Sequence, residues 1–373
     1  MAGGSSAWMQ HPWLCIYLKG EPIQLLPFVR REATMRNPVF LEKLRFAHYP
    51  PTIYPTLVYD KKKCKSCKAC FQACPTSCIQ WDDKAKSPYA TGLGGMDMAC
   101  LGCNNCESVC PTGAIKFRGE YRVLKGRYKT PDDKPTEMVF PMPFGEKDSG
   151  RSFEEIEKEL TETERIIYRR RSIRLFQDKP VPRELIERII EAARWGPSAG
   201  NCQPWKFVVM ANKQKIEELD RQCAKLLYGL KSIYIGKQRW RRVLVSLLSY
   251  LMVNNLDQRP FAALEKVKQS DGIICFGAPV VIHVLKDKRG IGNPDLDTGL
   301  ACQNLVLAAH SLGLGTLYIG LIVNALKYLP RRVKEGIGVK YPYDLVTSIC
   351  VGYPRGKIDN PIARARCPVE WIT

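Results

Sequence analysis

Two short runs of cysteines constrain the fold of this 373-residue chain more than any other feature. The first run reads CKSCKACFQACP at 64–75, and the second reads CLGCNNCESVCP at 100–111. In each run two residues separate the first three cysteines, three residues precede the fourth, and a proline follows. Half of the 16 cysteines lie in these runs, and the others occur singly. This clustering favours metal ligation over a framework of disulfides.

The spacing of each run is that of chains that bind two 4Fe–4S clusters. In that arrangement three cysteines of one run wrap a cubane, and the fourth ligates the other cluster. The spacing therefore predicts two ligand sets, Cys64, Cys67, Cys70 and Cys110 for the first cluster, and Cys100, Cys103, Cys106 and Cys74 for the second. We expect each fourth cysteine to start a helix that points away from the cluster of its own run. The alternative is a pair of structural zinc sites, which normally use C-x2-C units separated by long gaps.

The segment from Tyr59 to Arg118 resembles the bacterial two-cluster ferredoxin module. A proline breaks the chain after each fourth cysteine, and PTGAIKF at 111–117 predicts a turn followed by a short strand. Cys78 lies outside the ligand pattern, and we expect it to fill the core. Lysines crowd the first run, in KKKCKSCK at 61–68. Positive charge beside a cluster favours its reduced state and offers a docking face for an acidic electron-donor protein, such as a ferredoxin or flavodoxin.

From about Glu154 onward the sequence pattern predicts helices that alternate with strands. Ser152 and Glu155 have the spacing of a capping box that opens a long helical stretch. A second helix is predicted at 181–196, with an apolar face that includes Leu185 and Ile189 and a stop at Gly196. Strands are predicted at 203–210, 278–285 and 345–354, and a buried helix at 297–315.

The stretch at 169–209, RRRSIRLFQDKPVPRELIERIIEAARWGPSAGNCQPWKFVV, closely resembles the opening of the nitroreductase family of FMN enzymes. The resemblance continues through GLGTLYIG at 313–320 and RARCP at 364–368, so it covers roughly 154–373. It implies an α+β fold with a central, mostly antiparallel sheet flanked by helices. It also implies an intertwined homodimer with FMN at the interface, joined here to a small ferredoxin-like iron–sulfur domain.

The resemblance further implies which residues bind FMN, whose dianionic phosphate calls for fixed cations and hydrogen-bond donors. At the phosphate and ribityl end the family pattern implies Arg170, Arg171, Ser172, Arg174, Arg364 and Arg366. At the isoalloxazine edge it implies the turn Pro197, Ser198, Ala199, Gly200 and Asn201, which in the family comes from the partner subunit, and backbone donors from Tyr318, Ile319 and Gly320. The chemistry would belong to the flavin, with no side chain required as acid or base.

Several function classes lack support in the sequence. It contains no G-x-G-x-x-G fingerprint, Walker loop or nucleophile elbow, and its four histidines are scattered. The net charge of +20 favours acidic partners, but no nucleic-acid module accompanies it, so we expect no nucleic acid. The apolar runs are too short to span a bilayer and the start lacks a secretory signal, so we expect a cytoplasmic protein.

These features divide the chain into an N-terminal extension (1–56), a two-cluster ferredoxin domain (57–120), a linker (121–153) and an FMN domain (154–373). Within the last, the segment 214–269 is expected to vary in the family and to cover the flavin. Its aromatic and basic residues could line an acceptor pocket, namely Tyr228, Tyr234, Trp240, Tyr250, Lys231, Lys237 and Arg239. They could equally pack dimer or lid helices, and the basic, then apolar stretch 239–252 could instead touch a membrane surface.

A chain that joins clusters to a flavin domain is predicted to relay electrons. Clusters pass single electrons, whereas FMN accepts them one at a time and delivers two. We expect an FMN-dependent reductase fed by a low-potential donor through the first and then the second cluster. Its acceptor would be a small organic compound, such as a nitroaromatic, quinone-like, activated-alkene or halogenated one, and its host an anaerobe. Two alternatives stay open, an electron-transfer relay to a protein partner and a dehydrogenase that discharges electrons into ferredoxin.

Overall fold

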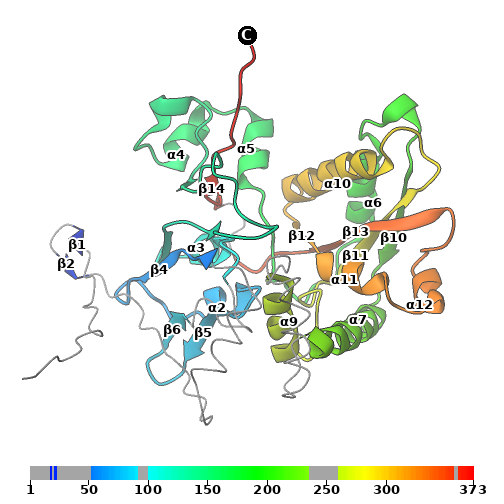
Figure 1. The fold of residues 1–373 in the computed structure, drawn as a ribbon, viewed down its shortest axis with the longest axis horizontal. Helices are drawn as coiled ribbons and strands as arrows, with labels where there is room; N and C mark the ends of the chain where they lie inside the picture. Colours follow the sequence, from blue (N-terminus) through cyan, green and yellow to red (C-terminus); the bar gives the residue numbers. More distant parts are fainter. Residues whose placement is uncertain (1–16, 19–20, 23–51, 91–99, 235–258, 357–359) are drawn as a thin grey trace, which may run out of the picture.

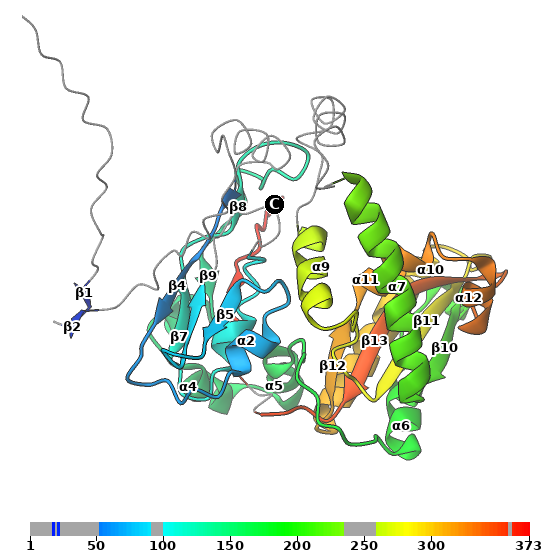
Figure 2. The same cartoon turned by 90° about the horizontal axis from the view of Figure 1, so that it is seen from below.

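The computed structural model describes residues 17–18, 21–22, 52–90, 100–234, 259–356 and 360–373, and these form two lobes (Figure 1). The smaller lobe holds both cysteine runs, and the larger holds a four-stranded sheet. In the described part of the chain, no helix is both long enough and apolar enough to cross a membrane. Figure 2 shows the two lobes side by side, with helices of the larger lobe facing the cysteine-bearing one.

The sheet of the larger lobe is antiparallel throughout, in the order β10–β11–β13–β12. Its strands are β10 (Trp205–Met210), β11 (Val280–Asp287), β13 (Tyr343–Gly352) and β12 (Gly315–Tyr318). The first three confirm the strands predicted from the sequence. The central strands β11 and β13 are mainly apolar because both faces of the sheet are covered.

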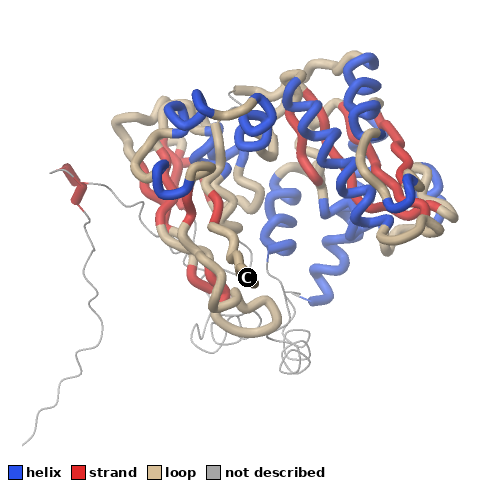
Figure 3. The backbone as a smooth tube through the Cα atoms, turned by 90° about the horizontal axis from the view of Figure 1, so that it is seen from above, coloured by secondary structure: helices blue, strands red, loops and turns tan. Residues whose placement is uncertain are grey.

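Helices cover both faces of this sheet, as Figure 3 shows. On one face α6 (Arg183–Arg194) and α10 (Pro294–Ser311) pack on Ile282 and Ile349. On the other face α7 (Lys213–Tyr234), α9 (Arg259–Gln269) and α11 (Gly320–Leu326) pack on Val281 and Cys350. Neighbouring residues of one strand thus enter opposite cores, and each fully buried aliphatic side chain contributes about 1.5–3 kcal/mol. The predicted α+β fold with a helix-flanked antiparallel sheet is confirmed.

The long helical stretch expected after Ser152 is broken into shorter pieces. The capping box of Ser152 and Glu155 is present, but it opens only α4 (Phe153–Ile156), which a 3-10 turn (η2, Glu157–Glu159) follows. A second capping box, of Thr161 and Glu164, then starts α5 (Glu162–Arg169). The second box satisfies the N–H groups of a new helix start and so fixes a separate element. A further short helix, α12 (Arg331–Gly336), follows α11.

The smaller lobe pairs β4 (Thr56–Tyr59) with β7 (Ile115–Arg118), and β5 (Ile79–Asp82) with β6 (Ser87–Ala90). Its helices are α2 (Ala69–Ala73) and α3 (Asn105–Val109). Each helix contains the third cysteine of a run and ends directly before the fourth, so the expectation that the fourth cysteine starts a helix is wrong. Cys74 and Cys110 instead follow the helix ends with extended backbone. The proline after each disfavours helical geometry at the preceding residue.

The segment expected to be a linker carries structure of its own. It contains β8 (Arg122–Val123), β9 (Met138–Val139) and the 3-10 turn η1 (Gly145–Asp148). β8 pairs with β3 (Thr52–Ile53), and β9 pairs with β14 (Arg364–Ala365) near the C-terminus. In the N-terminal extension a small pair, β1 (Tyr17–Leu18) and β2 (Glu21–Pro22), is also described. The linker therefore holds the C-terminal tail in place.

Candidate functional site

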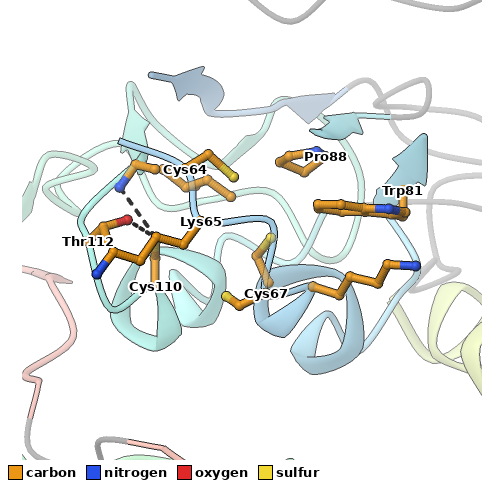
Figure 4. Close-up of a pocket in the computed structure, with 11 residues that line it drawn as sticks. Cys64, Lys65, Cys67, Trp81, Pro88, Cys110 and Thr112 are labelled. Atoms are coloured by element: carbon orange, nitrogen blue, oxygen red, sulfur yellow. Dashed lines mark hydrogen bonds between the residues drawn. The ribbon is translucent and has the colours of Figure 1, made fainter. Parts of the chain in front are cut away.

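The first predicted cysteine set surrounds a single pocket of the smaller lobe (Figure 4). The pocket is lined by Cys64, Cys67, Cys70 and Cys110, together with Trp81 and Pro88 from the β5–β6 hairpin. The fourth cysteine thus comes from the other run, as the predicted ligand exchange requires. Burial raises the pKa of Cys110, but hydrogen bonds from Thr112, Ala114 and Ile115 outweigh it and lower the net pKa. Such bonds favour the thiolate, which is the form that ligates iron.

The second predicted set, Cys74, Cys100, Cys103 and Cys106, lies deeper. Burial raises the pKa of Cys106 well above its ordinary value, and the nearby thiols of Cys103, Cys74 and Cys100 raise it further. A hydrogen bond with Cys78 lowers the pKa of Cys74. The thiols of Cys100, Cys103 and Cys106, whose pKa values are raised by burial and by the other cysteines of the set, fit a cationic group, because metal binding neutralises the thiolates.

Neither set converges on one point. Within the described residues, no three side chains of His, Cys, Asp or Glu are gathered as they are around a single metal ion. The first set instead borders a pocket, and the thiols of the second set lie near enough to shift one another's pKa. Cys78 is buried in the same core, as expected, and its sulfur also lies 3.3 Å from the Thr76 hydroxyl, a polar contact that the sequence did not indicate.

Two of the predicted phosphate-binding arginines lie close to each other. Arg170 follows the end of α5, and Arg364 lies in β14. Burial lowers the pKa of Arg170, the charge of Arg364 lowers it further, and Tyr318 opposes both. No carboxylate among the described residues pairs with either guanidinium. Two like charges drawn together without a counter-ion fit a dianionic group such as the phosphate of FMN.

The other predicted arginines point elsewhere. Arg171 is buried, and its Nη1 donates to Asn105 Oδ1 of the second cysteine run at 3.3 Å. Arg174 lies close enough to Cys103 to lower the pKa of that thiol, which burial raises. Arg366 faces Glu146, with 3.5 Å between its Nη1 and the carboxylate. Ser172 forms a parallel bridge with Thr316 beside β12. The structure thus divides the expected arginine cluster among three places.

The turn Pro197–Asn201 is held by an aspartate whose role the sequence did not predict. Asp297, buried in the first turn of α10, accepts a hydrogen bond from the Ala199 amide at 3.2 Å. Within the turn, Ser198 Oγ accepts from the Gln203 amide at 3.1 Å. Gly200 and Asn201 both have positive φ, which suits a tight exposed turn. The only sequence signal for this contact is an acidic residue at the start of a buried helix.

The backbone donors expected at 318–320 are only partly available. The Ile319 amide donates to the Ser348 carbonyl at 2.8 Å, so this N–H is engaged within the sheet, and the role of Ile319 as a flavin donor stays a prediction. Its N–H instead continues the pairing of β12 with β13. Tyr318 is partly exposed at the end of β12, and Gly320 opens α11.

The segment 214–269 is described only at its ends. α7 covers its first part and α9 its last. Tyr228 packs on the core, and its hydroxyl donates to the Leu264 carbonyl at 3.3 Å. For this tyrosine the packing alternative is confirmed. Outside the described side chains lie Lys231, Tyr234, Lys237, Arg239, Trp240 and Tyr250.

Comparison with known proteins finds two family models on this chain. One, described as the nitroreductase family, matches residues 167–353, and the other, a 4Fe-4S dicluster domain, matches residues 63–119. The second match supports the 4Fe–4S prediction over the zinc alternative.

Individual proteins are also similar to parts of this chain. A putative NADH dehydrogenase/NAD(P)H nitroreductase of Methanothermobacter thermautotrophicus is 32% identical over 155 residues, which are 41% of this chain and 57% of that relative. The match therefore spans little more than half of that relative's length. An iodotyrosine deiodinase of Hydra vulgaris is 28% identical over 65% of this chain and 84% of its own length. Among solved structures, a nitroreductase with bound FMN from Desulfitobacterium hafniense has 23% identity and a TM-score of 0.43, covering 57% of this chain and all of its own.

Proposed function

Because the chain belongs to the nitroreductase family and carries a 4Fe–4S dicluster domain, we propose that it is an FMN-dependent oxidoreductase. Its flavin would receive electrons one at a time from the two clusters. Electrons from a low-potential, ferredoxin-like donor enter at the first cysteine set, cross to the second, and leave toward the flavin domain and an organic acceptor. When bound, FMN supplies the ability to take up electrons singly and release them in pairs. The names of the relatives, a nitroreductase and an iodotyrosine deiodinase, support nitroaromatic and halogenated acceptors.

The observation that carries this proposal is the contact between the second cysteine run and the larger lobe. Asn105 accepts a hydrogen bond from Arg171, and the carbonyl of Ser108 accepts one from Asn360 at 2.8 Å. Both contacted residues lie in α3. Asn105 directly precedes Cys106, the third cysteine of that run, and Ser108 lies between the third and the fourth. The second set therefore faces the flavin domain, whereas Cys67 of the first set is exposed. This arrangement supports an order of transfer from the surface to the interior.

The surface around the first set supports an acidic donor. Lys61, Lys62, Lys63 and Lys65 are exposed beside Cys64 and Cys67. A patch of one sign accelerates encounter with a partner of the opposite sign. The donor would dock where the first set comes nearest to the solvent.

For FMN, the paired guanidiniums of Arg170 and Arg364 would hold the phosphate, and the turn at 197–201 would meet the ring system from a second subunit. The exposed apolar side chains next to this turn support a homodimer. Trp195 is 73% exposed, Ile291 57% and Leu296 57% in the single chain. Exposed large apolar groups gathered around a predicted partner-facing turn are typical of an interaction surface.

Anaerobic turnover tests the proposal. The protein, purified without air, is reduced with a ferredoxin-type donor, and flavin absorbance is followed as a nitroaromatic or an iodinated phenol is added. We expect reoxidation by at least one acceptor class, and loss of donor-fed turnover in C67A with FMN still bound. A wild-type protein that holds no acid-labile sulfide, or a C67A variant as active as wild type with the protein donor, would contradict the proposed path.

A further inference from the structure

A lysine of the larger lobe lies against the helix that leads to the second cysteine set. Lys266, in α9, donates from Nζ to the Phe71 carbonyl at 3.5 Å, and the same atom lies 4.9 Å from the centre of the Phe71 ring. Phe71 lies in α2, between Cys70 and Cys74. One turn of helix farther on, Gln269 accepts a hydrogen bond from the Ser77 hydroxyl at 2.6 Å. The end of α9 is thus anchored on both sides of Cys74, and both main views place α9 beside α2 (Figures 1 and 2).

Two arginines of the larger lobe also lie beside the second set. Arg171 and Arg174 line a small pocket between the lobes with Ala73 and Asn105. Asn105 links them to the cysteine run, because its Nδ2 donates to the Ala73 carbonyl at 3.0 Å while its Oδ1 accepts from Arg171. Three cations of the larger lobe therefore lie near the second set.

The cations near the first set are either paired with a carboxylate or exposed to solvent, as Lys61 and Lys65 are. Lys63 lies 3.5 Å from Asp60, and Lys68 lies 2.8 Å from Asp83, so each is paired with a carboxylate. Lys266 is half-buried, and no described carboxylate pairs with it. A charge in a partly desolvated site acts on its neighbours more strongly than one in water. We therefore expect Lys266 to act on the second set more strongly than a fully exposed lysine acts on the first.

We propose that Lys266 sets the reduction potential of the second cluster above that of the first, so that electrons collect next to the flavin domain. This inference rests on the proposed function, since it assumes the two clusters and their order. In this step one electron would pass from the first cluster, which is oxidised, to the second, which is reduced. No proton or atom would move with it. The reduced cluster carries one more negative charge than the oxidised cluster, so a nearby ammonium group stabilises the reduced form. Lys266 thus acts on the second cluster through its charge and does not itself carry the electron.

A redox titration of the two clusters tests this role. The holoprotein is titrated with dithionite and mediators under argon, and each cluster is followed by its electron paramagnetic resonance signal. In K266M, we expect the reduced-to-oxidised ratio of the higher-potential cluster at a fixed potential to fall about tenfold, which is ~59 mV for a one-electron couple. The lower-potential cluster should be unchanged. K266R should restore the wild-type value.

The matched control is K268M, because Lys268 is exposed two residues farther along the same helix. We expect neither cluster to shift in K268M. Iron and acid-labile sulfide contents verify that each variant holds both clusters, and K266Q replaces K266M if the latter loses iron. Two intact clusters with unchanged potentials in the Lys266 variants would overturn this inference alone. A wild-type protein without two clusters would overturn the proposed function instead.

Discussion

At the scale of single residues, the two paired arginines allow a sharp test of flavin binding. Arg170 and Arg364 lie close enough for each charge to act on the other, whereas Arg366 faces Glu146 on the surface. Hydrogen bonds between charged groups contribute about 1.5–3 kcal/mol each. We therefore expect R170Q and R364Q each to weaken FMN binding roughly 10- to 100-fold, measured by flavin fluorescence after dilution.

The control for this test is R366Q, which removes the same charge two residues farther along the chain. We expect its FMN affinity to stay within about threefold of wild type, because exposed ion pairs contribute little. Equal losses in R364Q and R366Q would mean that both arginines bind the phosphate, as the family pattern alone implies.

His283 is a single residue that should make the stability of the fold depend on pH. It is fully buried in β11, and its Nδ1 lies 2.9 Å from the Ser348 hydroxyl. Burial lowers its pKa to about 4, from an ordinary value of 6.5. Between these values the unfolded chain binds a proton that the folded chain does not, so the free energy of unfolding falls as the pH falls from 6.5 to 4.

Urea unfolding at pH 7 and pH 4.5 measures this contribution. H283Q can keep the hydrogen bond to Ser348 but does not titrate. We expect wild type to lose about 2–3 kcal/mol more than H283Q between the two pH values. The comparison cancels losses that both proteins share, including acid lability of the clusters. Parallel losses in the two proteins would show that His283 is not the group that titrates.

At the scale of elements, α10 positions the turn at 197–201. Asp297 is buried at the start of this helix and binds the Ala199 amide, and Gly196 lies so close that an added Cβ would be 2.9 Å from the Ala301 backbone. We expect D297A to lower the free energy of unfolding by about 1–3 kcal/mol, because it leaves the amide without its acceptor. D295A, which removes an exposed carboxylate of the same helix turn, should cost less than about 1 kcal/mol. Chemical denaturation of the anaerobic protein checks both, and similar small losses would exclude a structural role for Asp297.

The elements also show what local sequence signals reveal. The strands at 205–210, 280–287 and 343–352 could be predicted because both faces of the sheet are covered and most residues of the strands are apolar. The break between α4 and α5 could have been found from a second capping box at Thr161, which has the same spacing as the one that was recognised. The end of each short helix before Cys74 and Cys110 follows from the proline after it.

At the scale of the whole molecule, the sequence predicted both lobes but not the contact between them. Cysteine spacing and the arginine-rich stretch are local patterns, so each indicated its own cofactor. The pairing of Arg171 with Asn105 joins residues 66 positions apart, and that of Lys266 with Phe71 joins residues 195 apart. Nothing in either stretch encodes its distant partner. For this reason an arginine expected at the phosphate lies instead against the second cysteine run.

The charge distribution of the molecule leads to a final prediction about the electron donor. Lys61 and Lys65 are exposed beside the first cysteine set, whereas Lys215 and Lys327 are exposed on the larger lobe. We expect K61E/K65E to lower kcat/KM for an acidic protein donor roughly tenfold or more at low salt, because local charge steers the encounter. K215E/K327E changes the net charge equally, so it should have a much smaller effect. At 0.5 M salt the difference should nearly vanish, since screening shortens the reach of surface charges. Stopped-flow reduction by the donor measures both variants, and equal slowing in the two would mean that total charge, rather than a docking face at the first set, governs the encounter.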